Sequence, residues 1–495
     1  MFGLDVGLSI LLGICLLCVC AFEFINGFHD TANAVATVIY TKSLKPWVAV
    51  IISGILNGIG VFVGGTAVAM GIIKMLPVET LVDQNMAHSI GMVAAILLTA
   101  IFWNLGTWYL GIPASSSHTL IGSILGVGIA YSFLPDADGV AVNWYKVRDI
   151  GLALLCSPLF GFGFAMALMY LLKTLFRKNE SLFASPDGDT PPPWWMRAIL
   201  IGTCCAVSFS HGSNDGQKGI GLMMLILIGI VPSYFALNQN SDLSQLKPAV
   251  ASVQEAVAEL SSADVSGENK STLEKLQQDV ARLSSIGTET NGFTQLADTE
   301  AKGEDDPRFA IRKEILLITD AAKKLSGSTK SLDPSNPLVG QVEKLSKASK
   351  GLNTFTEYAP SWVVVVIALS LGIGTMIGWK RIVVTIGEKI GKTHLSYAQG
   401  AAAELVAAST IAISTFGLHL PVSTTHVLSS GIAGTMFARG GKENMQWSTV
   451  SKIIWAWVLT APVCIVMSGG VVLAVPTDHR LSPVDSFNAQ PQAPA

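Results

Sequence analysis

The chain has 495 residues, of which half are hydrophobic and 14% are charged. This composition, with a mean hydropathy of +0.50, excludes an ordinary soluble domain and is typical of a polytopic membrane protein. The formal net charge is only −3, and no basic block with interleaved aromatic residues occurs, so nucleic acid is not an expected partner.

Apolar segments of membrane length follow one another along the chain. A span needs about 20 apolar residues, and ten such segments lie near residues 6–40, 47–73, 91–111, 114–134, 150–176, 196–235, 360–379, 396–417, 420–437 and 450–475. The first and sixth are too long for one straight span and contain polar strings, so each is expected to be a helix broken at mid-membrane. The predicted fold class is an all-α polytopic membrane protein with broken helices and about 10–12 membrane segments.

The cysteines all lie in these apolar segments, at Cys15, Cys18, Cys20, Cys156, Cys204, Cys205 and Cys464. This placement predicts no disulfide framework. The first three have no histidine or acid at ligand spacing and are interpreted as packing residues, so we expect no metal site and no cofactor. The N-terminal run lacks the basic start and cleavage site of a signal peptide, and it is expected to remain as the first span.

The order of the segments predicts six regions. Residues 1–176 form a first membrane repeat, 177–195 a polar linker, 196–239 the start of a second repeat, 240–357 a soluble helical insert, 358–476 the remainder of the second repeat, and 477–495 a disordered tail. Basic residues at the start of the linker favour its placement in the cytoplasm, whereas the side of the insert depends on whether the sixth segment crosses once.

The insert carries a helical pattern. Its apolar residues follow the i, i+3, i+4, i+7 spacing of an amphipathic helix at Leu243, Leu246, Val250, Val253, Val257 and Leu260. Further helical stretches start near Arg308 and Pro337, with flexible joints around residues 287–306. An inert spacer is the favoured interpretation, and a regulatory domain is the alternative.

A polar string interrupts the first apolar run. Residues 26–34 read N-G-F-H-D-T-A-N-A, and Glu23 lies just before them. Charges at membrane depth are costly unless they are paired or face a cavity, so intramembrane acids indicate function. Glu23 and Asp30 are therefore candidates for cation or proton coupling, with helix capping the alternative for Asp30. His29 is either a proton relay or a plain buried hydrogen-bonding group.

Two pairs of motifs reveal an internal repeat. Residues 26–30 align with residues 211–215, which places Asp30 opposite Asp215, at an offset of 185. The string P-A-S-S-S-H-T-L at 113–120 aligns with P-V-S-T-T-H-V-L at 421–428, at an offset of 308. The offsets differ by about the length of the insert, so one duplication explains both. With an odd number of crossings per half, the second half is inverted, as in secondary transporters; an even number would require re-entrant elements.

The hydroxyl strings are predicted to begin helices. Proline is tolerated in a first turn, and hydroxyl groups cap free amides, so each start directs N–H groups and partial positive charge at an anion. Ordinary capping is the alternative for one string, but two matched copies favour anion binding. The candidate ligands are Ser115, Ser116, Ser117, Ser423, Thr424 and Thr425. His118 and His426 are expected to brace the helix starts.

The acids decide which anion is expected. A carboxylate near an anion fits if it binds the coupling cation or accepts a hydrogen bond from a protonated oxyanion, which phosphate supplies near neutral pH and sulfate does not. Asp30 and Asp215 therefore favour phosphate over sulfate. Glu404 is a further candidate for ion coupling, and Lys218 either neutralises phosphate or reaches an interface. Neither the hydroxyl strings nor residues 212–218 form a catalytic motif, so no enzyme is expected.

These motifs resemble the PiT (inorganic phosphate transporter) family, in particular the low-affinity phosphate transporters of Gram-negative bacteria. The resemblance rests on N-G-F-H-D-T-A-N-A-V-A at 26–36, S-H-G-S-N-D-G-Q-K-G at 210–219, and the two hydroxyl strings, with support from residues 372–379 and 385–391. It implies a multi-pass inner-membrane symporter that moves phosphate with protons or sodium, or as a neutral metal–phosphate complex.

The resemblance also implies roles for individual residues. Asp30, Asn33, Asn214 and Asp215 would face the substrate or the coupling cation, and the hydroxyl groups would bind phosphate. The sequence departs from the usual pattern at His29 and at residues 216–218, which favours protons over sodium. Partners are then phosphate, the coupling cation and the bilayer, with a homodimer expected. The alternatives are a sodium-coupled phosphate or sulfate permease, and a membrane receptor or scaffold that works through the insert.

Overall fold

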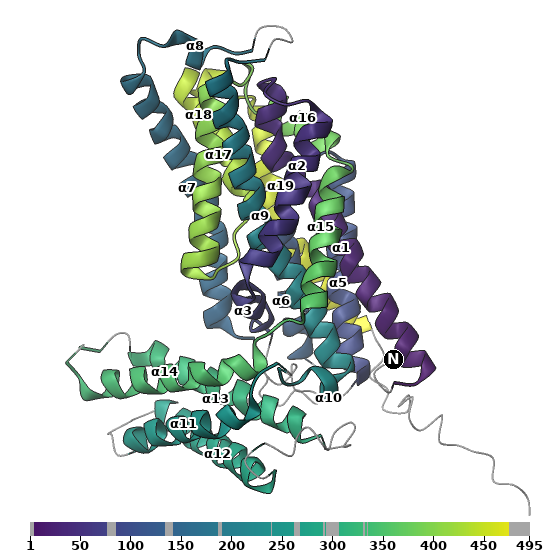
Figure 1. Ribbon diagram of the computed structural model, residues 1–495, viewed down its shortest axis with the longest axis vertical. Coiled ribbons are helices and arrows are strands. Elements are labelled where there is room, and N and C mark those ends of the chain that lie inside the picture. Colours follow the sequence, from purple (N-terminus) through teal and green to yellow (C-terminus); the bar gives the residue numbers. More distant parts are fainter. Residues whose placement is uncertain are drawn as a thin grey trace, which may run out of the picture. The chain divides into compact units, whose positions relative to one another are not determined.

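The structure of the protein is a computed structural model. It describes residues 4–76, 86–133, 142–186, 191–238, 240–261, 268–290, 293, 306–329, 332–333 and 335–474, and the side chains of residues 31–33, 86–90, 232, 233, 261 and 268 also lie outside the description. Within the described residues the regular elements are all helices, and the β-pairing is confined to an isolated bridge between Gly391 and Met445. The predicted all-helical class is confirmed (Figure 1).

The chain divides into two compact units. The insert unit comprises Met1–Leu12, Val78–Gln84 and Met224–Pro360, and the membrane unit comprises Gly13–Pro77, Asn85–Met223 and Ser361–Ala495. The insert unit thus begins and ends outside the predicted 240–357. The predicted tail at 477–495 lies outside the described residues.

The helices of the membrane unit follow the predicted segments. They are α1 (Val6–Tyr40), α2 (Pro46–Gly64), α3 (Ala67–Ile73), α5 (Met86–Tyr109), α6 (Ser116–Tyr131), α7 (Trp144–Leu175), α8 (Glu180–Phe183), α9 (Trp194–Ile230), α15 (Ser361–Met376), α16 (Lys380–Glu388), α17 (Tyr397–Ala412), α18 (Thr424–Gly440) and α19 (Trp447–Ala474). Six described helices are long and apolar enough to cross a membrane, or seven if α15 and α16 together form one bent span.

The helix breaks lie elsewhere than predicted. Both polar strings lie within uninterrupted helices, α1 and α9, because their side chains find partners on neighbouring helices and leave the backbone ladder intact. The breaks instead follow α2 and α15, at Gly65 (φ 74°) and Gly378 (φ 75°), conformations that glycine adopts without strain. The axis turns by 63° between α15 and α16.

The two hydroxyl strings begin helices that are shorter than a membrane span. α6 has 16 residues and α18 has 17, which at 1.5 Å per residue is less than the roughly 30 Å of a bilayer core. Their first residues are buried, so both helices begin inside the membrane unit. The predicted helix starts are confirmed.

Helices of the two repeats cross in close contact at glycine residues. A Cβ atom on Gly27 of α1 would lie 2.4 Å from a carbonyl oxygen of α15, and one on Gly374 of α15 would lie 2.1 Å from a carbonyl oxygen of α1. The second repeat makes the matching contact, because Gly212 of α9 and Gly60 of α2 have the same relation, at 2.1 and 2.3 Å. Backbones this close need small residues, and each crossing joins one helix from each half.

The helices that begin with the hydroxyl strings also pack on the opposite half, and we call this arrangement exchanged repeats. α6 of the first half packs along α19 of the second, and α18 of the second half packs along α7 of the first. Gly126 meets Ile465 at one crossing, and Gly161 meets Val427 at the other. Neither repeat therefore has a complete core without the other.

The insert unit contains a bundle of four helices. These are α11 (Leu246–Ser261), α12 (Glu268–Glu289), α13 (Pro307–Thr329) and α14 (Pro337–Thr356), preceded by α10 (Pro232–Phe235) and a 3-10 turn at Leu243–Gln245. Five of the six predicted apolar residues are buried in its core, and Leu243 packs against it. The starts predicted near 308 and 337 are confirmed, whereas α12 extends through residue 287 where a joint was expected.

A buried arginine fixes the base of this bundle. The Arg312 guanidinium donates hydrogen bonds of 3.0 Å to the carbonyl oxygens of Ala236 and Thr356, which belong to the segments entering and leaving the bundle. Burial lowers the pKa of Arg312 to about 10, so the side chain is still charged at neutral pH. A charge-assisted hydrogen bond contributes about 1.5–3 kcal/mol.

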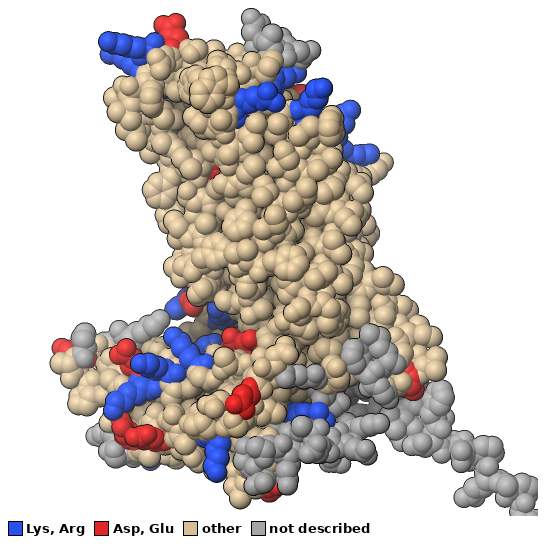
Figure 2. All heavy atoms as spheres, in the orientation of Figure 1, with Lys and Arg blue, Asp and Glu red and all other residues tan. Residues whose placement is uncertain are grey.

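Charge is distributed unevenly on the membrane unit. Basic residues gather where α1 meets α2, at the end of α7 and along α16 (Figure 2), and the described members include Lys42, Lys45, Arg177, Lys178, Lys380, Arg381, Lys389, Lys392, Arg439 and Lys442. Arg197 and Arg439 join these segments through hydrogen bonds to the carbonyl oxygens of Ser43 and His394. At the opposite ends of the helices the described basic residues are Lys74, Lys146 and Arg148.

The glycine crossings make a prediction about stability. Gly60→Ala should lower the thermal midpoint of the detergent-purified protein by several degrees, because overpacking costs about 1–3 kcal/mol. Gly58→Ala is the matched control on the same helix, since its Cβ would lie at an ordinary 3.6 Å from Ala368. The midpoint is measured as the temperature at which half of the monodisperse protein is lost, and it should be lower for Gly60→Ala than for Gly58→Ala. Equal midpoints would show that the crossing tolerates a methyl group.

A carboxyl group in the insert predicts a pH dependence. Burial and, to a smaller degree, the nearby Asp279 carboxylate raise the pKa of Glu314 above 4.5. The proton is thus held more tightly in the folded state, so this contribution to stability is present below pH 4.5 and is lost as the pH rises through the folded pKa. Glu314→Gln should stabilise the insert at pH 7 and flatten this slope. Heat-dependent proteolysis of the full chain at several pH values tests this, with Glu343→Gln, exposed on α14, as the control.

Candidate functional site

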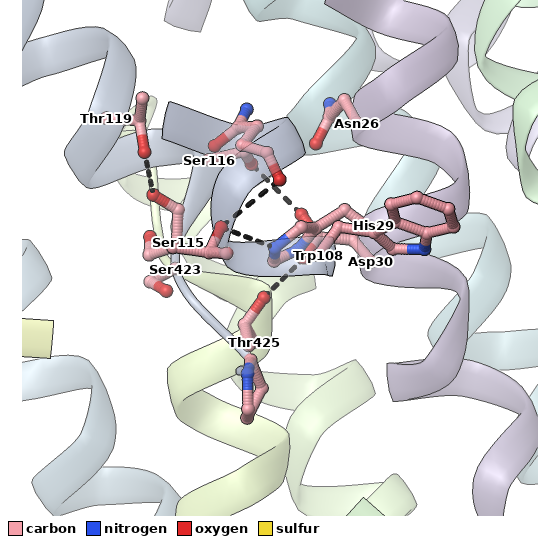
Figure 3. Close-up of polar contacts among 12 residues, drawn as sticks. Asn26, His29, Asp30, Trp108, Ser115, Ser116, Thr119, Ser423 and Thr425 are labelled. Carbon is pink, nitrogen blue, oxygen red and sulfur yellow. Dashed lines mark hydrogen bonds and ion pairs between the residues drawn. The ribbon is translucent and has the colours of Figure 1, made fainter. Parts of the chain in front are cut away.

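Asp30 lies where the two halves of the membrane unit meet. The Ser116 hydroxyl at the start of α6 donates a 2.9 Å hydrogen bond to Asp30 Oδ2, and the Thr425 hydroxyl at the start of α18 donates a 2.5 Å bond to Oδ1. Figure 3 shows the two hydroxyl groups approaching the carboxylate from different helices. Asp30 is buried, so these bonds replace water as its solvation. The polar string and both hydroxyl strings thus meet at one carboxylate.

Asp215 lies beside this carboxylate and is paired with a lysine. Lys218 Nζ lies 2.5 Å from Asp215 Oδ2, and both side chains are fully buried. The same ammonium group donates to Ser116 Oγ at 2.9 Å and Ser117 Oγ at 3.0 Å. Ser116 Oγ also lies 3.4 Å from Asp215 Oδ2. One hydroxyl group therefore links the two predicted acids.

His211 lies between the two acids. Its Nε2 is 3.4 Å from Asp215 and 3.8 Å from Asp30, and its Nδ1 lies 2.9 Å from Asn57 Oδ1. The amide nitrogen of Asn57 donates to Thr375, so its oxygen is left to accept from Nδ1–H. A proton on Nε2 would then face both carboxylates. The imidazole and carboxylate ligand atoms of Asp30, His211 and Asp215 lie within 4.8 Å of one another, close enough to hold a cation.

His29 approaches Asp30 from another side. Its Nδ1 is 3.4 Å from Asp30 Oδ1, and its Nε2 is 3.2 Å from the Thr107 hydroxyl. That hydroxyl donates to the carbonyl oxygens of Trp103 and Asn104, so it accepts from His29 Nε2–H. Nδ1 is then the nitrogen that faces the carboxylate. This geometry suits a proton relay and equally a fixed hydrogen-bonding group, as expected from the sequence.

The helix starts show the predicted capping. Ser115 and Ser423 accept from the backbone N–H groups of His118 and His426, each at 3.2 Å. The His118 ring also contacts Ser115 Oγ at 2.9 Å, so this serine and histidine brace the first turn. Thr424 is buried at the first helical position of α18. In each helix start the hydroxyl cap therefore satisfies one of the N–H groups that lack an acceptor within the helix.

The two helix starts also contact each other. The Ser117 hydroxyl donates to the Val422 carbonyl oxygen at 3.1 Å. The His118 and His426 rings lie 4.5 Å apart between centroids, and the Trp457 ring covers His426 at 4.1 Å. Two helix N-termini therefore converge on one region, where their partial positive charges add.

Asn214 supports the site from behind. Its amide nitrogen donates to Thr415 Oγ1 at 2.7 Å and to Leu420 O at 3.3 Å, and its oxygen accepts from Val422 N at 3.2 Å. It was predicted to face the substrate, but these contacts hold the loop that leads into α18. The side chain of Asn33 lies outside the described residues.

The other predicted acids occupy separate places. Glu23, fully buried one helical turn before the polar string, accepts from Asn26 at 3.3 Å, and its Oε1 has no hydrogen-bond partner. Glu404 is buried on α17, where it accepts from the hydroxyl groups of Thr37 and Thr203. The structure therefore places Glu404 with these threonines, outside the cluster of hydroxyl groups around Asp30 and Asp215.

Sequence reasoning missed two members of the site and left a third open. His211 aligns with Asn26 and precedes Asp215 by four residues, one helical turn on the same face, which was the available signal. Asn57 lies in an apolar segment whose pairing with α9 only the tertiary structure shows. Lys218 follows Asp215 at i+3, so its proximity was visible, but its contact with the hydroxyl strings was not.

Helix starts inside the membrane, exchanged repeats and buried acids between them define a polytopic membrane transporter with internal repeats. The chain belongs to the phosphate transporter family, whose pattern it matches over residues 26–468. This confirms the resemblance found in the sequence.

Relatives match the chain over nearly its whole length. It is 40% identical to the low-affinity inorganic phosphate transporter PitA of Escherichia coli K12, over 95% of this chain and 97% of that protein. It is 39% identical to the low-affinity inorganic phosphate transporter of Buchnera aphidicola (subsp. Acyrthosiphon pisum), over 94% and 96%. A solved structure, "The sodium-dependent phosphate transporter", has a TM-score of 0.52 at 18% identity, over 94% and 98%, and shows the shared fold. The protein is a phosphate transporter of the PiT family and a multi-pass protein of the bacterial inner membrane.

The position of Asn214 predicts a specific defect. Asn214→Ala removes three hydrogen bonds to residues 415–422, and each lost buried bond costs about 1–3 kcal/mol. The start of α18 should then be less well placed, and the KM for phosphate should rise about tenfold while the protein still folds. Asn143→Ala, which removes a cap from α7, is the control for losing an asparagine. An unchanged KM in Asn214→Ala would show that the loop is held by other contacts.

Proposed function

We propose that this transporter imports inorganic phosphate together with protons, at the buried cluster of Asp30, Asp215, Lys218 and the hydroxyl groups that begin α6 and α18. The observation that carries the proposal is the Ser116 hydroxyl, which lies 2.9 Å from Asp30 and 3.4 Å from Asp215. It unites the acids of both polar strings with the start of a helix that attracts anions.

The chemistry of the cluster fits a protonated oxyanion. Phosphate near neutral pH carries at least one O–H group, which a buried carboxylate can accept, while its other oxygens take hydrogen bonds from hydroxyl and backbone N–H donors. Ser115, Ser116, Ser117, Ser423, Thr424 and Thr425 are the proposed donors. Sulfate lacks the proton at this pH, so it would leave a carboxylate facing an anion without a bond.

The charges of the cluster support the proposal that a cation travels with phosphate. The described ionisable groups are the carboxyl groups of Asp30 and Asp215 and the ammonium of Lys218, with His29 and His211 beside them and Glu23 nearby on α1. An anion added to this site leaves excess negative charge in a medium that solvates it poorly. Histidine changes charge near neutral pH, which favours a proton over sodium as the coupling ion.

A divalent metal carried as a neutral complex with phosphate is the second form of substrate. Asp30, His211 and Asp215 present oxygen and nitrogen ligand atoms within 4.8 Å, a donor set that divalent ions accept. Glu23, with one unpartnered oxygen near this region of α1, is proposed to serve the coupling cation on its path. A role for Glu404 in coupling, a role for Asn33 at the substrate and a homodimer stay predictions.

The membrane orientation follows from the charge distribution. The basic end of the membrane unit carries ten of the basic residues named above, against three at the opposite helix ends. The positive-inside rule assigns the basic end to the cytoplasm. Because α1 ends in this basic region, its first residues would lie on the outer side. Labelling of Lys45→Cys and Arg148→Cys with an impermeant maleimide in intact cells distinguishes the two orientations.

Substitution of the two acids tests the site. In proteoliposomes, Asp30→Asn and Asp215→Asn should reduce labelled phosphate uptake to background, because each removes a buried charge that hydroxyl, imidazole or ammonium groups of the cluster contact. Asp149→Asn, at an exposed acid paired with its neighbour Arg148, is the matched control and should transport normally. Near-normal uptake by either buried variant would remove that acid from the site.

Imposed gradients test the coupling in the same preparation. Uptake should rise with an inward proton gradient and should not respond to an inward sodium gradient of equal size. Uptake that rises with the sodium gradient and does not respond to the proton gradient would establish the sodium-coupled alternative. Inhibition of phosphate uptake by sulfate at a concentration equal to that of phosphate would establish a general oxyanion permease. If deletion of residues 240–357 abolishes function while both acid variants remain active, the alternative of a receptor or scaffold that functions through the insert is supported.

A further inference from the structure

The two halves of the site differ in charge at the position of Lys218. The offset that pairs Asp30 with Asp215 also pairs Asn33 with Lys218. Asp30 accepts hydrogen bonds from both helix starts, at Ser116 of α6 and Thr425 of α18, and Asp215 lies 3.4 Å from the same Ser116. The first half therefore has a neutral amide where the second half has a cation.

The Lys218 ammonium has the surroundings of a bound cation. Its three N–H groups match three oxygen acceptors, Asp215 Oδ2 at 2.5 Å, Ser116 Oγ at 2.9 Å and Ser117 Oγ at 3.0 Å. A carboxylate and two hydroxyl oxygens are also the kind of ligand that small hard cations bind. The side chain has no exposed surface, so the ammonium does not extend to an interface. This geometry excludes the interface alternative that the sequence left open for Lys218.

We propose that Lys218 is a built-in cation, whose ammonium permanently fills at Asp215 the position of an exchangeable coupling cation. The proposal rests on the proposed symport at this site and identifies the residue that sets its cation selectivity. Sodium is then excluded from the Asp215 half, and exchange of the coupling cation is confined to the Asp30 half.

A tethered cation has a clear physical advantage in a carrier. It neutralises Asp215 both with and without substrate, so the empty site does not carry two uncompensated buried carboxylates during reorientation. It also cannot dissociate, and its binding loses little translational freedom because it is part of α9. One exchangeable cation then suffices to neutralise Asp30.

Replacing Lys218 by asparagine, the residue at the aligned position 33 of the first half, tests the proposal. Lys218→Asn restores an oxygen ligand and removes the charge, whereas Lys218→Met removes the charge without supplying a ligand. In detergent, 100 mM sodium relative to choline should raise the thermal midpoint of Lys218→Asn by about 3 °C, because a ligand that binds only the folded state stabilises it. The wild type and Lys218→Met should show no sodium-specific shift.

Transport gives the second measurement. Lys218→Asn should gain sodium-stimulated phosphate uptake and should move one more positive charge per phosphate, as measured by the reversal potential. No sodium response of Lys218→Asn in either assay overturns the proposal. A saturable sodium shift in the wild type also overturns it, and this result does not require any variant to fold.

The outcomes separate this proposal from the one on which it rests. Wild-type uptake that does not respond to a proton gradient contradicts proton coupling, regardless of the sodium response of Lys218→Asn. Proton-driven wild-type uptake with a sodium-insensitive Lys218→Asn leaves proton coupling intact and rejects the built-in cation alone. Lys218→Arg, which keeps the charge, should remain insensitive to sodium; sodium stimulation of this variant would also contradict the proposal.

Discussion

Two carboxylates buried within a membrane protein impose the constraint on which the rest of this structure depends. Asp30 and Asp215 have no bulk water to solvate them, so each requires hydrogen-bond donors or cations at short range. The structure supplies these from four helices at once: hydroxyl groups from the starts of α6 and α18, an imidazole and an ammonium from α9, and a second imidazole from α1. A carboxylate with such partners has its hydrogen bonds satisfied without distorting its own helix, which is why α1 and α9 continue through their polar strings.

The exchanged repeats provide the means of bringing these groups together. Helices of opposite halves cross at glycine pairs, such as Gly27 with α15 and Gly60 with α9, so the two polar strings come close while the hydroxyl strings enter from the sides. The two short helices begin inside the protein because their first N–H groups have buried hydroxyl caps, Ser115 and Ser423. The same arrangement produces a site where positive helix ends, acids and a lysine lie together, which provides both donors and acceptors for a partly protonated anion.

Much of this was accessible from residue types and spacing. The polar strings, their repeat at Asp215 and the capped helix starts all follow from rules of burial, duplication and helix capping, and the family match confirms the identity that they indicated. The amphipathic helix at 246–261 was equally visible, because period and burial are local properties. The prediction that α1 and α9 are broken was wrong, because hydropathy records the cost of buried polar groups but not the partners that remove this cost.

The sequence by itself thus determined the class of protein, the residues that must be satisfied at membrane depth and the family. Only the tertiary structure decided which of these residues meet. It placed His211 and Asn57 at the site, moved Asn214 to the loop before α18, paired Glu404 with threonines, and set Lys218 on Asp215 and the hydroxyl groups of α6. The reason is physical: the cost of burying a charge is a property of one residue, whereas its compensation depends in large part on groups distant in the sequence, such as Ser116 and Thr425 for Asp30, whose positions are fixed by the packing of helices.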